Sequence, residues 1–73
     1  MLESDEYKIL KKIAEVQVIT KYDLAKNFSN MNPHLNKIVE NLMKKGYIAN
    51  VSFGTSYLVI TNSGMRALWE YEK

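Results

Sequence analysis

Residues 20–48, TKYDLAKNFSNMNPHLNKIVENLMKKGYI, are typical of a short helix, a tight break, a second helix and the start of a strand. The first helix is predicted over 21–28, with Thr20 as its N-cap. Ser29 and Asn30 end this helix, because asparagine tolerates the left-handed backbone of a tight turn. The stretch therefore predicts two consecutive helices that lead directly into a sheet.

The second helix of this stretch is predicted over 33–45. Asn32 suits its N-cap, and Pro33 suits the first helical position, where a missing N–H costs nothing. Gly46 follows as the residue past the C-cap. The apolar residues have the i, i+3, i+4, i+7 spacing of an amphipathic helix, at Leu35, Ile38, Val39 and Leu42. One side of this helix is therefore expected to be buried and the other to face solvent.

The flanking segments add one helix before this stretch and a hairpin and a helix after it. A helix is predicted over 4–16, with Ser4 as its N-cap, and 17–19 is short and apolar enough to form a third strand. The alternating runs 48–53 and 57–61 predict an antiparallel hairpin, joined by Phe53-Gly54-Thr55-Ser56. A final helix is predicted over 63–72.

The composition limits the classes of function. The chain has 73 residues, which predicts one domain over 1–73, and 47% of them are hydrophobic. It has no cysteine, which excludes disulfides, thiolate metal sites and a cysteine nucleophile. No apolar stretch approaches the roughly 20 residues of a membrane-spanning helix, and the acidic N-terminus is unlike a signal peptide. We therefore expect a cytoplasmic protein.

The positive charge is concentrated on residues 20–46. The net charge is only +2, but 20–46 contains five lysines against two acidic residues, and 47–61 contains no charged residue. A surface that faces phosphates needs this excess of positive charge. The lone His34 has neither a second histidine nor converging carboxylates nearby in the sequence, so we expect no metal, no cofactor and no catalytic site.

The segments TKYDLAKNF and NPHLNKIVENLMKKGYI, followed by YLVIT and Gly64, occur in an order that resembles the winged-helix transcription regulators. The resemblance covers roughly residues 7–68 and is to the MarR, ArsR and PadR kinds, and especially to small archaeal regulators. It implies an α+β winged helix-turn-helix fold. That fold has a three-helix core, a β-hairpin wing over 47–61 and a short C-terminal helix over 63–72.

The resemblance makes 33–45 the recognition helix, which lies in the major groove of double-stranded DNA. Its N-terminal residues would meet base edges, and later ones would lie further along the groove. Asparagine can pair with adenine, and lysine can reach guanine or a phosphate. The predicted contacts from this helix are Asn32, His34, Asn36, Lys37, Asn41 and Lys44.

Other predicted contacts reach the phosphate backbone. At the start of the helix over 21–28 they are Thr20, Lys21 and Tyr22. In the turn after this helix they are Ser29 and Asn30. Wings of this superfamily often have Arg or Lys, but the tip of this hairpin has no cation. The wing is therefore expected to contribute weakly, through Ser52, Thr55, Ser56 and its backbone N–H groups, of which Thr55 and Ser56 are counted among the predicted contacts.

The last helix indicates a dimer, because its apolar residues lie on two sides and such a helix usually has two neighbours. The predicted dimer interface comprises Leu2, Tyr7, Ala67, Trp69 and Tyr71. The alternative is a single core with a frayed end. A two-fold homodimer would place its recognition helices one DNA turn, roughly 34 Å, apart and would favour a palindromic site.

The sequence thus predicts sequence-specific binding of double-stranded DNA by a dimeric transcriptional regulator. MarR-like proteins continue into long helices that enclose a ligand, and this chain ends at Lys73, so no small-molecule effector is expected. One alternative is a winged-helix module that binds proteins, since this fold also occurs in complexes that never touch bases. Another is an architectural protein that binds DNA with little specificity.

Overall fold

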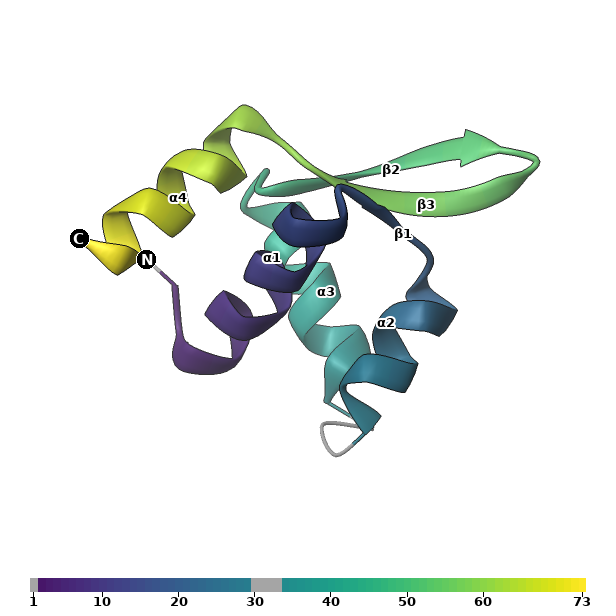
Figure 1. The fold of residues 1–73 in the computed structure, drawn as a ribbon, viewed down its shortest axis with the longest axis horizontal. Helices are drawn as coiled ribbons and strands as arrows, with labels where there is room; N and C mark the ends of the chain where they lie inside the picture. Colours follow the sequence, from purple (N-terminus) through teal and green to yellow (C-terminus); the bar gives the residue numbers. More distant parts are fainter. Residues whose placement is uncertain (1, 30–33) are drawn as a thin grey trace.

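The computed structural model describes residues 2–29 and 34–73. Within these residues the protein is α+β, with four helices and one three-stranded antiparallel sheet (Figure 1). This confirms the predicted α+β class. Three predicted positions lie outside the described residues. They are Asn30, predicted in the turn, and Asn32 and Pro33, predicted at the start of the helix over 33–45.

The first helix, α1 (Ser4–Val16), has the predicted bounds but a different N-cap. The cap is Glu3, whose backbone N–H donates to Glu6 Oε1 at 3.0 Å, so Ser4 is already the first helical residue. The Glu3 side chain in turn accepts a hydrogen bond from the Glu6 backbone N–H, which completes a capping box. The prediction of Ser4 as the cap was wrong because this capping box starts the helix one residue earlier. At the other end Gln17 has φ 72°, which limits the third strand, β1, to Val18–Ile19.

The next helix, α2 (Lys21–Asn27), begins as predicted. The Asp23 N–H donates to Thr20 Oγ1 at 3.0 Å, which confirms Thr20 as the N-cap. The helix ends one residue before the predicted position 28. Phe28 is the C-cap, with φ −127°, and turns its half-buried side chain toward the core.

The helix α3 (Leu35–Lys44) is shorter than the predicted 33–45. His34 is its N-cap and Lys45 its C-cap. The Gly46 N–H donates to the Met43 carbonyl and the Tyr47 N–H to the Leu42 carbonyl, both at 3.0 Å, and Gly46 has φ 79°. This pair of hydrogen bonds is a Schellman motif, and its left-handed residue is the glycine that the sequence predicted to end the helix.

The hairpin consists of β2 (Ile48–Phe53) and β3 (Thr55–Ile60) in the sheet order β1-β3-β2. The register is continuous from Ile48↔Ile60 to Phe53↔Thr55. The prediction placed the second strand at 57–61, after a three-residue connection at 54–56. It was wrong because Gly54, with φ 78°, makes the turn alone and lets the ladder reach Thr55.

The sheet has two different faces. Residues opposite one another share a face. The inner face packs on the helices and is polar toward the tip; it consists of Ile19, Ile48, Leu58 and Ile60, then Asn50, Ser52 and Ser56. The outer face consists of Val18, Ala49, Val51, Phe53, Thr55, Tyr57 and Val59. Apart from Thr55, the side chains of the outer face are aliphatic or aromatic.

The last helix, α4 (Asn62–Glu72), starts one residue before the predicted 63 because Thr61 is its N-cap. Thr61 Oγ1 accepts from the Gly64 N–H at 3.0 Å and donates to the Gly46 carbonyl at 2.6 Å. A Cβ at Gly64 would collide with the Tyr47 carbonyl oxygen, so glycine is required where α4 crosses this segment. Figure 1 shows α4 at the end of the molecule opposite the hairpin tip.

The core draws on every helix and strand. Its fully buried side chains include Ile9, Leu10 and Ile13 of α1, with Leu24, Val39, Leu42 and Leu58 from α2, α3 and β3. None of the described helices is long and apolar enough to cross a membrane.

An ion pair with a buried carboxylate and a partly exposed lysine joins α1 to the end of α3. Glu6 is 5% exposed, and its Oε1 accepts a hydrogen bond from Lys45 Nζ at 2.8 Å. Burial of this carboxyl opposes its ionisation. Hydrogen bonds from Lys45 and from the Glu3 main chain, together with the charge of Lys45, outweigh burial and hold the pKa of Glu6 below its ordinary value of 4.5.

Candidate nucleic-acid interface

The outward side of α3 is polar and partly cationic. Leu35, Val39 and Leu42 are buried on the inward side. The predicted contacts Asn36, Lys37 and Lys44 are exposed on the outward side, Asn41 is half-buried, and His34 is exposed at the N-cap. The structure therefore brings five of the six predicted α3 contacts onto one helix, and the sixth, Asn32, lies outside the described residues.

The lysines of α3 differ in their surroundings. Lys44 Nζ lies 4.0 Å from Glu40 Oε1, and both side chains are about three-quarters exposed, so this pair holds Lys44 only weakly. Among the described residues Lys37 has no ion-pair partner. Lys45, which the charge count placed with the others, instead pairs with Glu6 on α1. Two lysines of α3 therefore remain available to an anionic ligand.

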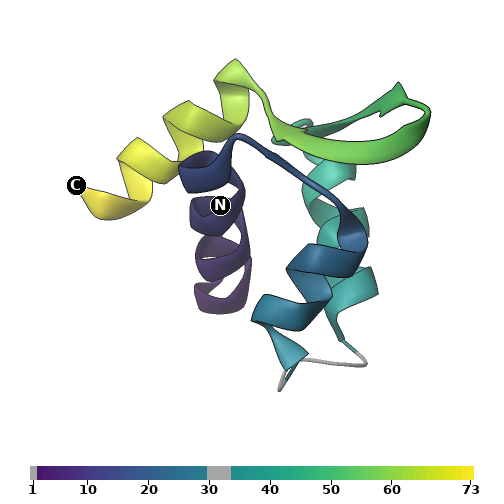
Figure 2. The ribbon, with the colours of Figure 1, turned by 45° about the vertical axis from the view of Figure 1, so that its right-hand side comes forward.

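The helix α2 lies beside α3 in both views (Figures 1 and 2) and adds further cations. Lys21 is exposed, and Tyr22 is 71% exposed with Lys26 Nζ 5.2 Å from its ring centre. Lys26 is a residue that the predicted contacts did not include, although its position one turn after Tyr22 could have indicated it. Thr20 has its hydroxyl oxygen committed to the helix cap, and Ser29 is exposed after α2.

The hairpin has hydroxyls and amides but no charge. The predicted contacts Thr55 and Ser56 are both exposed, but they lie on opposite faces of the sheet. Ser56 shares the inner face with Ser52 and Asn50, all exposed beyond the core. Asn50 was not among the predicted contacts, although the alternation of the strand would have placed it with Ser52.

The predicted dimer interface is dispersed over the terminal helices. Leu2 is 8% exposed and belongs to the domain's own core. Tyr7 stacks on Tyr71 at 4.3 Å between ring centres, and its hydroxyl donates to Glu72 Oε2 at 2.7 Å. Each of these tyrosines thus already has a neighbour within the chain.

The other two predicted residues of α4 differ in exposure. Trp69 is 60% exposed, with Lys73 Nζ 4.6 Å from its ring centre, and Ala67 is half-buried. Trp69 is the most exposed side chain of the predicted interface, and Tyr71, although stacked on Tyr7, is still 44% exposed, so both are open to a partner.

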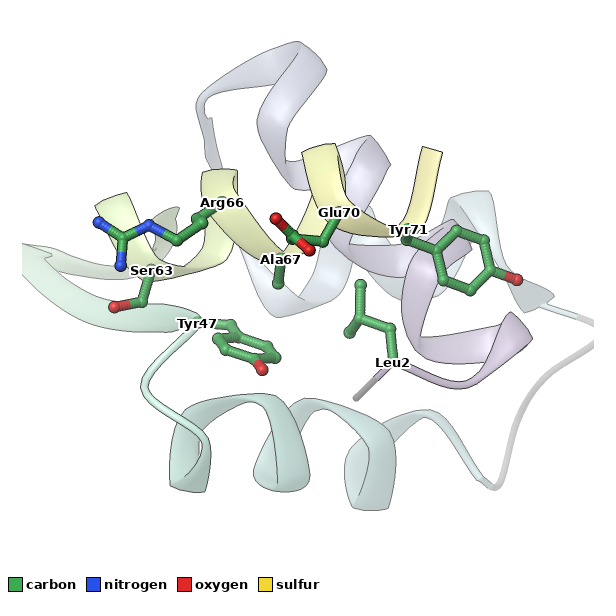
Figure 3. A pocket seen from close by; sticks show the side chains of 7 residues that line it. All are labelled: Leu2, Tyr47, Ser63, Arg66, Ala67, Glu70 and Tyr71. Carbon is green, nitrogen blue, oxygen red and sulfur yellow. The ribbon is translucent and has the colours of Figure 1, made fainter. Parts of the chain in front are cut away.

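An open cavity of about 660 Å³ lies between α4, Tyr47 and Leu2 (Figure 3). The lining combines apolar and aromatic side chains with three polar ones that come from α4. Its lining is Leu2, Tyr47, Ser63, Arg66, Ala67, Glu70 and Tyr71. This volume is within the range of small-molecule sites, so the expectation that no effector binds remains a prediction.

No group of three or more His, Asp or Glu side chains that could hold a metal occurs within the described residues. Comparison of the chain with protein-family models, with curated proteins and with solved structures found no match. The candidate site therefore rests on the geometry and charge of α2, α3 and the hairpin.

Proposed function

We propose that this protein is a winged-helix regulator that binds double-stranded DNA sequence-specifically. The order α1-β1-α2-α3-β2-β3 with the sheet order β1-β3-β2 supports the fold, since a helix pair followed by a hairpin is its layout. The observation that supports DNA binding is the outward side of α3. Its exposed Asn36 and Lys37 and accessible Lys44 lie opposite the buried apolar residues of the helix.

In this proposal α3 enters the major groove, where base edges are distinguishable. Asn36 reads an adenine, and Lys37 binds guanine acceptors or a phosphate at the N-terminal end of the helix. Lys44 contacts a phosphate further along, after its weak pair with Glu40 opens. Lys21, Tyr22 and Lys26 of α2 anchor the neighbouring backbone.

The hairpin contributes little charge to binding. Its inner-face residues Asn50, Ser52 and Ser56 can donate hydrogen bonds to phosphate oxygens without adding to the electrostatic attraction. The salt dependence of binding is therefore expected to come from α2 and α3 alone.

A homodimer through the terminal helices is also part of this proposal. Trp69 and Met65 are both more than half exposed on α4, and they border a groove between α1 and α4. A two-fold arrangement would place two copies of α3 on a palindromic site.

Selection of bound sequences from a random duplex pool tests the function. Enrichment of one motif, palindromic if the dimer forms, is the expected result. Asn36→Ala should then lose about 1–3 kcal/mol at a single base position and little elsewhere. Asp5→Ala, on the exposed start of α1, is the control and should leave the motif unchanged. An Asn36→Ala loss that is equal on all sequences would contradict base reading.

A protein-interaction module is the second candidate, and the outer face of the sheet favours it. Val18 and Phe53 on that face are 52% and 75% exposed, and β2 and β3 contain no charged residue. Exposed apolar surface of this kind often marks a contact with another protein. A selection that enriches no DNA sequence would favour this candidate over the regulator.

A further inference from the structure

The strand β2 forms an unprotected edge of the sheet. It is terminal in the order β1-β3-β2, and among the described residues no other strand pairs with its outer side. Its register with β3 is unbroken, so no bulge twists the edge away from a partner. Its sequence, IANVSF, has neither the lysine nor the proline that usually protects such an edge. The edge is therefore competent to pair with another strand.

The hydrogen-bond pattern between β2 and β3 determines which main-chain groups of β2 point outward from this edge. The Thr61 N–H donates to the Tyr47 carbonyl at 3.0 Å, which makes these two residues a hydrogen-bonded pair. Hydrogen-bonded and non-hydrogen-bonded pairs alternate along an antiparallel ladder. The even-numbered residues of β2 therefore turn their N–H and C=O groups outward, and they are Ile48, Asn50 and Ser52.

The side chains near the edge are uncharged and differ by face. On the outer face β2 has Ala49, Val51 and Phe53, and on the inner face Asn50 and Ser52. Phe53 is 75% exposed, and its ring centre lies 6.5 Å from that of Tyr57. A strand laid along this edge would cover part of the Phe53 ring, which is favourable because it removes apolar surface from water.

We infer that β2 pairs antiparallel with β2 of a second copy of this chain, about a two-fold axis at Val51. The strand order becomes β1-β3-β2-β2-β3-β1 across the two copies. Asn50 of each copy lies opposite Ser52 of the other, and their outward N–H and C=O groups form four main-chain hydrogen bonds. Val51 meets Val51 of the second copy in the non-hydrogen-bonded position.

The side chains of β2 are self-complementary in this register. Phe53 of one copy lies opposite the small Ala49 of the other on the outer face, and Asn50 lies opposite Ser52 on the inner face. No like charges meet at the axis, because β2 has no charged residue. A shift by one residue would pair outer-face with inner-face positions and lose both matches.

This pairing is weak and separate from the proposed function. Two six-residue strands make an interface at the small end of specific ones, below about 1,200 Å², so the association is concentration-dependent. The hairpin points away from α4 (Figure 1), so the contact is distinct from the terminal helices and does not rest on DNA binding.

A cysteine placed at the axis tests the geometry. The full chain has no cysteine, so a disulfide formed by Val51→Cys joins two copies. The Cα atoms of a non-hydrogen-bonded pair lie about 4.5 Å apart, within disulfide reach. We expect Val51→Cys to cross-link at least about tenfold faster than Val18→Cys, a similarly apolar outer-face control on β1. Equal rates, or fast cross-linking by Trp69→Cys alone, would overturn the inference.

Sedimentation of the full chain gives a second measurement. Val51→Lys places two like charges opposite each other and should weaken self-association at least about fivefold. Ser56→Lys adds the same charge to the inner face of β3, away from the β2 edge, and should have a smaller effect. A parent chain that stays monomeric at high micromolar concentration, or equal effects of the two variants, would refute the pairing. DNA affinity is measured separately and has no part in either outcome.

Discussion

The dependence of DNA affinity on salt is the most direct consequence of the proposed interface. Four lysines on α2 and α3, Lys21, Lys26, Lys37 and Lys44, can face phosphates, whereas Lys45 is held by Glu6 at 2.8 Å. If each of the four neutralises one phosphate, log K should fall with log salt with a slope of about −3.6 per protomer. A rise from about 50 to 200 mM salt would then weaken binding roughly 150-fold.

Substitution of one lysine should reduce this slope by a fixed amount. If Lys37 contacts a phosphate and not guanine, Lys37→Ala removes that contact. The slope should then become shallower, at about −2.7, and the same rise in salt should weaken binding only roughly 40-fold. Lys44→Ala should act similarly, because its pair with Glu40 is long and exposed. Fluorescence anisotropy with a labelled duplex, repeated at several salt concentrations, measures both slopes.

Lys73→Ala is the matched control for this measurement. It removes the same charge at the end of α4, remote from the hairpin in Figure 1, and should leave the slope near the parent value. A slope that changes equally in Lys73→Ala and Lys37→Ala would mean that the net charge of the chain, and not the α2–α3 surface, governs binding. That result would refute the assignment of the interface.

Three further predictions concern the fold that supports this interface. Gly64→Ala should lower the free energy of unfolding by about 1–3 kcal/mol in urea titrations, because its Cβ would collide with the Tyr47 carbonyl; an unchanged midpoint would contradict this close approach. Glu6 has a lowered pKa in the folded state, so its stabilisation is present above its ordinary value of 4.5 and is lost as the pH falls through the folded-state value. Glu6→Gln should therefore be less stable than the parent at neutral pH, with a smaller difference in acid, and a difference independent of pH would argue against the ion pair with Lys45. Thr20→Ala should cost about 1 kcal/mol by thermal unfolding, since its hydroxyl caps α2, whereas Thr20→Ser should retain most of that stability.

Local patterns in the sequence predicted most of the helices and strands. The cap at Thr20 and the left-handed Gly46 occur where the residue types indicated, because both depend on neighbours within a few positions in the chain. The α+β class follows from the same patterns. The ends of elements were less accurate, as at Phe28 and Thr55, because one residue decides between helix, turn and strand there.

The candidate site was only partly accessible from the sequence. The outward position of Asn36, Lys37 and Lys44 follows from helical spacing, and the structure agrees. The pairing of Lys45 with Glu6 could not be foreseen, because the two residues lie 39 positions apart in the chain. Only the fold brings these two charges together, and the burial of Glu6 makes an unpaired carboxylate at that position costly.

The sequence alone thus determined which residues form helices and strands and which side of each is apolar, since these depend on local spacing and local hydrogen bonds. The tertiary structure decided what lies across the chain from each residue. It placed Glu6 against Lys45 and Gly64 against Tyr47, and it put β3 between β1 and β2. Within residues 2–29 and 34–73, that order leaves the outer edge of the uncharged strand β2 unpaired. No local pattern in IANVSF could indicate this, because whether a strand lies at an edge depends on which strands pair with it.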